Sequence, residues 1–468
     1  MEIIMLFSDT VAAVSTPRGR GGIAVIRVSG SDTAAVISRV FRPMGSIDPA
    51  SLPPRRACYG RIVTSDAEGE REIDRGIVTF YKGPASFTGE DMAEISCHGG
   101  VYVTRAVLSA VLSAGARMAD AGEFTRRSFL AGKLTLTEAE AVGALLEADT
   151  EDKMLLAASA AGGKLSDKVS GIARDLTSVM TALYAAIDYP EEDLDDVDET
   201  EIGSAVSSAL LEVRRLLSTY RRGRAVAEGV KCVICGRPNA GKSSLYNLIT
   251  GEESAIVTDI AGTTRDVLRE RVSFGGVTLE LCDTAGLRET EDSVESIGVR
   301  RAEREMQSAE LIIAVFDSAS PMTEDERRMM DSYTDAPKIA VINKGDLKSA
   351  LAEEDIKLIE EKHTATVRMS CAAGDGLEDL SRVVGEIFDS GSCDLKRDAV
   401  IWSARQESTL RLAEGYLAAA EESFLAGDPV DAVCTLCESA LSHLAETDGR
   451  GVTEEIVAGI FSKFCVGK

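Results

Sequence analysis

Between residues 9 and about 130, apolar residues recur at every second position in short segments that turn-forming residues separate. A period of two is typical of strands with one buried face, and it predicts strands at Val11–Val14, Ile23–Val28, Arg75–Tyr81 and Met92–Cys97. The spacing of apolar residues in Asp32–Val40 instead fits a helix. The first part of the chain is therefore predicted to be a mixed α/β domain.

From Leu134 onward, apolar residues recur with helical spacing, and alanine, leucine and glutamate become frequent. Helices are predicted over residues 136–148, 153–160, 166–186, 202–222, 404–426 and 429–447. Gly223–Gly229 is interpreted as a linker from the fourth of these helices into an apolar strand. Helices thus flank a central segment on both sides, which predicts one helical domain built from two chain segments, with the central segment inserted between them.

The length of 468 residues favours about three domains. The changes in pattern place an N-terminal domain at 1–133, the first part of the helical domain at 134–226, the inserted domain at 227–388 and the second helical part at 389–468. Leu377–Phe388 is predicted to be the last helix of the inserted domain. The predicted fold class is a multidomain α/β plus all-α protein.

The inserted segment begins with an apolar strand, Val230–Cys235, that runs directly into Gly-Arg-Pro-Asn-Ala-Gly-Lys-Ser. The glycines of such a P-loop let the backbone curl, so that its N–H groups point at phosphate oxygens. In this motif the lysine reaches the β- and γ-phosphates, and the serine hydroxyl can ligate magnesium. The loop residues predicted to contact a nucleotide are Asn239, Ala240, Gly241, Lys242, Ser243 and Ser244.

Three further motifs follow the P-loop in the order that GTPases use, and each follows a predicted strand, of which the first two are 277–282 and 338–342. Asp283-Thr284-Ala285-Gly286 can hold Mg²⁺ through water and sense a γ-phosphate. Asn343-Lys344-Gly345-Asp346 offers a carboxylate that can accept two guanine N–H groups, which adenine cannot supply. Ser370-Cys371-Ala372 can offer a backbone N–H to guanine O6. The four motifs together predict a Ras-like GTP-binding domain with a doubly wound sheet.

The predicted GTPase lacks two common catalytic groups. Leu287 stands where a glutamine orients the attacking water in Ras-like switches, and the motifs contain no obvious arginine finger. The acidic segment 287–295 could supply a carboxylate in place of the glutamine. A cation between the phosphates could replace the arginine, because Asn239 and the oxygen-rich segment 258–264 offer hard ligands. An ordinary loop-capping role for Asn239 stays open at this stage.

The net charge of −26 argues against general nucleic-acid binding, which depends on the neutralisation of phosphates. An RNA contact would need a local basic cluster or a partner. The candidate clusters are Arg18 with Arg20, Arg126 with Arg127, and Arg214–Arg224, and a solvated face is the favoured interpretation of each. The acidic run 188–201 is likewise interpreted as a solvated loop or helix start.

The sequence predicts no membrane segment. The longest aliphatic and aromatic stretch, Leu311–Phe316, is too short to cross a bilayer, and the short acidic N-terminus does not fit a signal peptide. Cys434 and Cys437 lie in an amphipathic helical pattern, which favours packing over a metal site. We therefore expect a cytoplasmic protein with reduced thiols and no membrane association.

Several motifs outside the GTP site are specific enough to indicate a family. They are Thr16-Pro-Arg-Gly-Arg-Gly-Gly22, Ser86-Phe-Thr-Gly-Glu-Asp91, Gly122-Glu-Phe-Thr125, Ile187-Asp-Tyr-Pro-Glu-Glu192, Ile260-Ala-Gly-Thr-Thr-Arg-Asp266 and Phe464-Cys-Val-Gly-Lys468. With the P-loop, they resemble the MnmE (TrmE) family of tRNA-uridine-modifying GTPases over essentially the whole chain. Val466 is a conservative departure, because the family usually has isoleucine there.

The resemblance implies an N-terminal tetrahydrofolate-binding domain that dimerises, a helical domain and an inserted G domain. It implies a homodimer that assembles with an FAD-dependent partner, MnmG (GidA), into a heterotetramer or a larger complex. The two proteins would add an aminomethyl-type group, such as carboxymethylaminomethyl, to C5 of the wobble uridine of certain tRNAs. The cofactors implied are K⁺, Mg²⁺ and 5-formyl- or 5,10-methylene-tetrahydrofolate.

The resemblance also implies roles for residues that match the family's motifs. The implied folate site consists of Arg27, Glu94, Lys133 and Lys468. The implied potassium ligands are Asn239, Thr258, Ile260 and Thr263, and the implied magnesium ligands are Ser243 and Thr264. Glu295 is the implied catalytic glutamate. The predicted GTP contacts in this switch segment are Thr258, Asp259, Ile260, Ala261, Gly262, Thr263 and Thr264. For Cys465, a packing role is favoured over a catalytic thiol.

Two other function classes were compared with this interpretation. An RNA- or ribosome-associated switch GTPase would carry a basic RNA-binding module after its G domain, whereas this chain continues with largely acidic helices. A stand-alone folate aminomethyl transferase would not need a GTPase. The sequence leaves open which tRNAs are modified, whether glycine or ammonium is the amine donor, and the stoichiometry with the partner.

Overall fold

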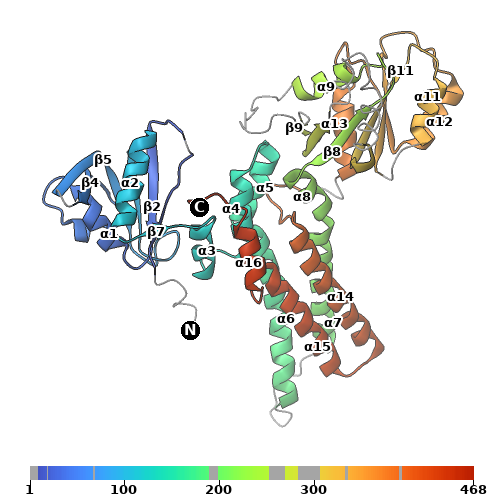
Figure 1. Cartoon of the computed structure of the whole chain (residues 1–468). Helices are drawn as coiled ribbons and strands as arrows, with labels where there is room; N and C mark the ends of the chain where they lie inside the picture. Colours follow the sequence, from blue (N-terminus) through green and yellow to red (C-terminus); the bar gives the residue numbers. More distant parts are fainter. Residues whose placement is uncertain are drawn as a thin grey trace. The chain divides into compact units, whose positions relative to one another are not determined.

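A computed structural model of the chain describes residues 9–17, 19–66, 69–188, 199–251, 269–282, 306–331, 336–388 and 393–468. The chain divides into two compact units, which are described one after the other (Figure 1). Unit 1 contains Met1–Gly143 and Asp448–Lys468, and unit 2 contains Ala144–Thr447. Within the described ranges, no helix has the length and apolar character needed to cross a membrane.

Unit 1 is built on a sheet with the strand order β3-β4-β5-β6-β2-β1-β7. The strands are β1 (Val11–Val14), β2 (Ile23–Ser29), β3 (Phe41–Pro43), β4 (Ala57–Asp66), β5 (Gly69–Tyr81), β6 (Met92–His98) and β7 (Arg117–Met118). Neighbouring strands are antiparallel, except that β1 and β7 are parallel. The mixed α/β character expected from the sequence is confirmed.

One face of this sheet is covered by α1 (Thr33–Val40) and α2 (Val101–Ser113) (Figure 1). Residues of β2 and β6 alternate between the two faces, so that Ile26 and Ile95 are buried against the helices. Arg27 and Glu94 therefore lie on the other face, where the strand register places them directly opposite each other. The period of two thus puts a charged pair on the face opposite α1 and α2, which is called the open face below and where Phe87 and Phe124 lie against Arg27.

Three more helices complete unit 1, namely α3 (Glu123–Leu130), α4 (Leu136–Leu146) and α16 (Glu454–Phe461). Leu136 and Ala139 of α4 form a buried cluster with Val457 and Phe461 of α16. This apolar contact attaches the last part of the chain to the N-terminal unit, although more than 300 residues separate α4 from α16 in sequence.

The last four residues, Cys465–Lys468, lie along unit 1 and are called the tail below. The N–H of Phe124 at the start of α3 donates to the Lys468 carbonyl (3.1 Å), and Ser15 Oγ donates to the Gly467 carbonyl (2.8 Å). Gly467 has φ 101°, and a Cβ there would lie 2.3 Å from the Val14 carbonyl oxygen. Only glycine fits this close approach, so the backbone fixes where Lys468 lies.

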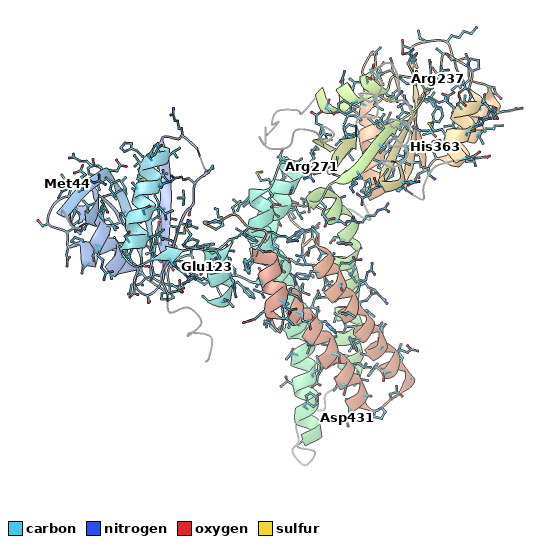
Figure 2. The ribbon with its side chains drawn as sticks, viewed as in Figure 1. Met44, Glu123, Arg237, Arg271, His363 and Asp431 are labelled. Atoms are coloured by element: carbon cyan, nitrogen blue, oxygen red, sulfur yellow. The ribbon has the colours of Figure 1, made fainter. Side chains whose placement is uncertain are left out.

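A buried ion network holds the start of α3. The Arg127 side chain is only 1% exposed and pairs with Glu123 (2.8 Å), Asp9 (2.9 Å) and Glu90 (3.1 Å). Burial alone would raise the pKa of Glu123, but hydrogen bonds from Arg117, the Asp120 N–H and Arg127 hold that pKa below its ordinary value. Glu123, labelled in Figure 2, therefore stays ionised next to the residues that bind the tail.

Unit 2 contains the helical part and the G domain. The helices are α5 (Glu151–Ala161), α6 (Lys164–Asp188), α7 (Glu199–Ser218), α8 (Tyr220–Ala227), α14 (Ala404–Ala426) and α15 (Val430–Thr447). The long helices α6 and α7 pack against α14 and α15, which come from the other side of the G domain in sequence (Figure 1). The helical domain built from two chain segments, with an inserted G domain, is thus confirmed.

The structure corrects the predicted linker. Most of Gly223–Gly229 is helical and belongs to α8, and the predicted helix over 202–222 is interrupted at Thr219. The Thr219 hydroxyl accepts the Ile401 N–H (3.1 Å), and a Cβ on Gly223 would lie 2.1 Å from the Ile401 carbonyl oxygen. Gly223 thus allows close packing of α8 against Ile401, whereas the sequence analysis interpreted this glycine as the start of a linker.

The G domain has a sheet with the order β13-β12-β11-β8-β10-β9, in which only β9 is antiparallel to its neighbour. Its strands are β8 (Val230–Cys235), β9 (Arg269–Phe274), β10 (Val277–Cys282), β11 (Leu311–Asp317), β12 (Lys338–Asn343) and β13 (Ala365–Arg368). Among the described residues of this domain, the helices of eight or more residues are α9 (Lys242–Gly251), α11 (Glu324–Asp331), α12 (Glu353–Lys362) and α13 (Leu377–Phe388). β11 is buried along its whole length, as expected for a central parallel strand.

Candidate functional site

The P-loop connects β8 to α9, and two glycines determine its path. A Cβ on Gly236 would lie 2.3 Å from the Val315 carbonyl oxygen, and one on Gly241 would lie 2.0 Å from Asn343 Nδ2. Helix α9 begins at Lys242, so that the N-terminus of the helix faces the loop. The P-loop lysine is part of that first turn, and its Nζ donates to the Arg237 carbonyl (2.8 Å).

Asn343, at the end of β12, ties the base-recognition loops to the P-loop. Its Nδ2 donates to the Ala240 carbonyl (2.8 Å), and its Oδ1 accepts the Cys371 N–H (2.9 Å). Ser370 Oγ donates to Asp346 Oδ1 (2.6 Å), which orients the carboxylate predicted to recognise guanine. Burial raises the pKa of the Cys371 thiol to about 11, so this cysteine stays neutral and contributes through its backbone.

Asp317, at the end of β11, is a residue of this site that the sequence analysis missed. Its Oδ2 accepts a hydrogen bond from Arg237 Nη2 (2.8 Å) in the P-loop and from Lys344 Nζ (2.8 Å) in the base-recognition loop. Burial raises the pKa of this carboxyl, but the bonds from Lys344, the Ala319 N–H and Arg237 together lower it below its ordinary value. The position of Asp317 directly after an apolar strand is the signal that could have found it.

Eleven of the predicted GTP-site residues line one cavity of about 460 Å³. They are Asn239, Gly241, Lys242, Ser243, Ser244, Asn343, Lys344, Asp346, Ser370, Cys371 and Ala372, and Leu347 joins them. Ala240 is fully buried behind the loop. Arg237, labelled in Figure 2, points to Asp317. The geometry brings together the loops for phosphate and for base that the sequence placed far apart.

The other predicted residues of the GTP site lie outside the described residues. These are Thr258, Asp259, Ile260, Ala261, Gly262, Thr263 and Thr264 in the first switch segment. They also include Asp283, Thr284, Ala285, Gly286 and Glu295 in the second. Of the implied ion ligands, Asn239 and Ser243 are described, and both line the cavity. Their side-chain oxygens are hard ligands of the kind that K⁺ and Mg²⁺ prefer.

A second cavity, of about 420 Å³, lies in unit 1 and brings together three of the four predicted folate residues. Arg27, Glu94 and Lys468 line it. Arg27 pairs with Glu94 (2.8 Å), and the Tyr81 hydroxyl donates to the same carboxylate (3.4 Å). Burial and the Glu94 charge raise the pKa of Tyr81, so the phenol stays protonated. The sequence analysis did not identify Arg55, Tyr81 or Phe87, which also line this cavity.

Lys133, the fourth predicted folate residue, does not line this cavity but supports its wall. Its Nζ donates to the carbonyls of Pro84 (3.0 Å) and Ser86, and Ser86 is a lining residue. The segment Ala85–Phe87 is thus held by Lys133 on one side and faces the cavity on the other. A ligand in the cavity would contact Lys133 only if this ammonium changed its partners.

The basic clusters that the sequence offered as RNA contacts are largely neutralised. Arg127 belongs to the buried network described above, so it is not part of a solvated face as expected. In the helical part, Arg214 pairs with Glu414, Arg215 with Glu212, and Arg224 with Glu228 and Glu310. Arg18 lies outside the described residues, and Arg20 is exposed.

Solved structures similar to this chain include Era from Aquifex aeolicus and the G domain of the T. maritima FeoB iron transporter. The Era structure is 24% identical, with a TM-score of 0.28, and the match covers 40% of this chain and 66% of that chain. The FeoB structure is 25% identical, with a TM-score of 0.24, and the match covers 34% of this chain and 97% of that chain.

Two family descriptions and several relatives match nearly the whole chain. Residues 10–133 match "GTP-binding protein TrmE N-terminus", and residues 136–465 match "MnmE helical domain". The tRNA modification GTPase MnmE of Natranaerobius thermophilus is 39% identical over 98% of this chain and 99% of its own length. That of Thermotoga maritima is 39% identical over 98% of this chain and all of its own length.

Proposed function

The chain belongs to the MnmE (TrmE) family of tRNA modification GTPases, and from this premise we propose that it hydrolyses GTP during the modification of tRNA wobble uridines. It would act in the cytoplasm with an FAD-dependent partner of the MnmG (GidA) kind. The product would carry an aminomethyl-type group, such as carboxymethylaminomethyl, on C5 of the uridine. The observation that carries the proposal is that one chain holds both a P-loop cavity and a separate cationic cavity suited to folate.

In the nucleotide cavity, each described residue has a role in binding. Lys242 neutralises the phosphates, Ser243 would hold Mg²⁺ together with Thr264, and Asp346 accepts the two guanine N–H groups. Asn239 would hold K⁺ together with Thr258, Ile260 and Thr263. When bound, these ions would supply positive charge to the phosphates, on which charge develops during hydrolysis. Glu295 would orient the attacking water, because Leu287 cannot.

In the unit 1 cavity, aromatic and ionic side chains are suited to a folate. Phe87 and Tyr81 offer apolar ring surfaces, and Glu94 offers a carboxylate that can accept N–H groups of a pteridine. Arg27 keeps that carboxylate in place through two hydrogen bonds, of 2.8 and 3.2 Å. Lys468 lines the same cavity. The proposed ligand is 5-formyl- or 5,10-methylene-tetrahydrofolate.

The homodimer is proposed from the open face of the unit 1 sheet. Tyr59 and Ile77 are direct cross-strand partners there and are 53% and 41% exposed, and Ile23 nearby in the sheet is 68% exposed. Exposed apolar side chains on a sheet face favour burial against another surface. Because the described basic clusters are mostly paired, tRNA binding would be shared with the partner protein.

The proposal can be tested in a strain that lacks the gene by mass spectrometry of its wobble uridines. The wild-type chain should restore the modification. A chain that lacks Val466–Lys468 should fail to restore it and should still hydrolyse GTP, because the tail belongs to unit 1 and the nucleotide cavity to unit 2. Unmodified uridines after complementation with the wild-type chain and its partner would refute the proposed function. Loss of both activities in the shortened chain would mean that the tail serves folding.

A further inference from the structure

Among the described residues other than glycine, three have a left-handed backbone conformation, namely Arg55 (φ 60°), Asn239 (φ 61°) and Lys344 (φ 63°). A residue with a Cβ is held there at a cost of about 1 kcal/mol or more, and such residues cluster at functional sites. Asn239 and Lys344 line the nucleotide cavity, and Arg55 lines the unit 1 cavity. The conformation of Arg55 thus calls for an explanation in that second cavity.

Local contacts hold Arg55 at the wall of the cavity. It follows Pro53 and Pro54, and its backbone N–H donates to the Phe80 carbonyl (2.7 Å). Its Nη2 donates to the carbonyl of Ala85 (3.2 Å), a lining residue of the same cavity. A guanidinium has five N–H donors, so a single bond to a neutral carbonyl leaves most of them available to a ligand.

The charges of the cavity show what kind of ligand group would satisfy Arg55. Arg27 is already paired with Glu94, the carboxylate that lines the cavity. Within the described ranges, no ion pair involves Arg55, and its side chain is exposed. With Arg27 and Glu94 paired, the charge of Arg55 remains as an excess of positive charge among these lining residues. An anionic group on the ligand would balance this excess, and a carboxylate matches the planar fork of a guanidinium.

We propose that Arg55 binds the carboxylates of the glutamate tail of a folate and so makes the site prefer folates with several glutamates. This inference rests on the folate site proposed above. It gives the glutamate tail of the ligand a partner, which Arg27, Glu94 and Lys468 do not provide. The pteridine end would lie against Glu94 and Arg27, and the acidic tail would leave the cavity past Arg55. Each added glutamate brings another carboxylate within reach of this cation.

Titration calorimetry on the full chain tests the assignment with three ligands. These are 5-formyl-tetrahydrofolate with one glutamate, the same compound with three glutamates, and 5-formyl-tetrahydropteroate, which has none. The test variant is Arg55→Gly, because glycine adopts φ 60° readily and should leave the fold intact. The matched control is Arg56→Gly, which removes an equal charge from an adjacent exposed residue that does not line the cavity.

The wild-type chain should bind the triglutamate most tightly and the pteroate most weakly. Arg55→Gly should weaken both glutamylated ligands about tenfold or more, leave the affinity for the pteroate unchanged, and make the affinities less dependent on salt. Arg56→Gly should behave as wild type. An equal loss for all three ligands, or no loss, would overturn the role of Arg55. If the wild-type chain binds none of the three, the folate site itself is refuted, and the tail assignment with it.

Unchanged GTP hydrolysis and an unchanged oligomeric state in Arg55→Gly are part of the expected result. A variant that lost folate because unit 1 no longer formed its proposed dimer would also lose affinity for the pteroate. That pattern would contradict direct contact between Arg55 and the tail.

Discussion

In the nucleotide cavity, the described loops follow mutually parallel strands of one sheet. The unit 1 cavity is instead lined by a cross-strand ion pair, a turn and the last residue of the chain. The carboxyl ends of parallel strands meet at one edge of a sheet, so motifs that follow such strands converge wherever they stand in the sequence. Arg27, Arg55, Glu94 and Lys468 have no such rule to bring them together. Function is therefore much easier to predict from sequence for the first site than for the second.

The two sites are also held in place by different forces. In the nucleotide cavity, backbone groups and close glycine contacts fix the loops, as at Gly241 against Asn343. In unit 1, the buried pair of Arg127 and Glu123, together with the partly exposed Asp9, holds the start of α3, which in turn binds the tail. The second site should thus be sensitive to the loss of a charge from this network, whereas the first should depend more on its backbone contacts.

The largest expected effect concerns hydrolysis in the nucleotide site. Glu295→Ala should lower kcat by about 10³-fold, and replacement of K⁺ by Na⁺ should lower it by a smaller factor, because both remove groups that act only on the transition state. GTP affinity should survive both changes. Steady-state GTPase assays at constant ionic strength measure kcat, and titration with a fluorescent GTP analogue measures the affinity for the nucleotide. Equal rates in the two salts would contradict the potassium site, and an active Glu295→Ala variant would contradict the role of the glutamate.

The next effect would show that the two sites are independent. Arg127→Met removes a buried cation shared by Glu123, Asp9 and Glu90. Because Arg117 still pairs with Glu123 and Asp9, we expect a cost below the roughly 3–5 kcal/mol of a buried charge left with no partner. Hydrogen exchange on the full chain should show faster exchange at α3 and β1, and folate binding should be lost. Nucleotide binding should remain, as should both properties in the control Arg126→Met. Lost nucleotide binding in Arg127→Met would contradict the independence of the sites.

The same network predicts a dependence on pH. The pKa of Glu123 is lower in the folded chain than its ordinary value of 4.5. Its contribution to stability is therefore complete above about pH 4.5 and is lost as the pH falls through the lower, folded value. Protection of the α3 amides, corrected for the intrinsic exchange rate, should therefore fall in acid, and Glu123→Gln should reduce this loss of protection. An identical acid response in Glu123→Gln would contradict the role of this carboxylate.

A smaller effect is expected for base recognition in the nucleotide cavity. Asp346→Asn should weaken GTP by about 1.5–3 kcal/mol, because a charged acceptor of two hydrogen bonds is lost. Weak ATP binding should not change further. Xanthosine triphosphate, which has an oxygen in place of the guanine amine, should bind the variant better than GTP does. If the variant keeps its preference for GTP over ATP, Asp346 does not recognise the base.

The smallest effect is expected at Asp317, which touches both loops of the nucleotide cavity. Asp317→Asn removes the charge that Arg237 and Lys344 share, and should weaken GDP and GTP alike by about 1 kcal/mol. The rate at which bound GTP is hydrolysed should not change, because Asp317 contacts the two loops and does not line the nucleotide cavity. Asp331→Asn, in an exposed ion pair, is the control. A change in kcat without a change in nucleotide affinity would contradict this positioning role.

Local elements were predicted well because their patterns are local. The strands Val11–Val14 and Val230–Cys235 and the helices Leu377–Phe388 and Ala404–Ala426 have the predicted bounds. The errors arose where packing decided the outcome. Gly223 is a contact glycine within α8, and Arg127 is a buried cation. Neither differs from a flexible glycine or a surface arginine when only neighbouring residues in the sequence are considered.

The sequence alone determined the chemistry of the nucleotide site, because a P-loop and a base-recognition loop are short contiguous motifs whose backbone carries the function. It did not determine that Asp317 links these loops, or that Arg55 faces the same cavity as Arg27 and Lys468. The place of Asp317 was decided by the register of β11 with β12, which sets it opposite Asn343. In unit 1, the pairing of β2 with β6 and the burial of apolar residues of α4 against α16 decided which charges meet. The free energy gained by burial is roughly proportional to the apolar area removed from water and does not depend on which apolar partner covers that area. Only the folded chain therefore shows which distant charges meet.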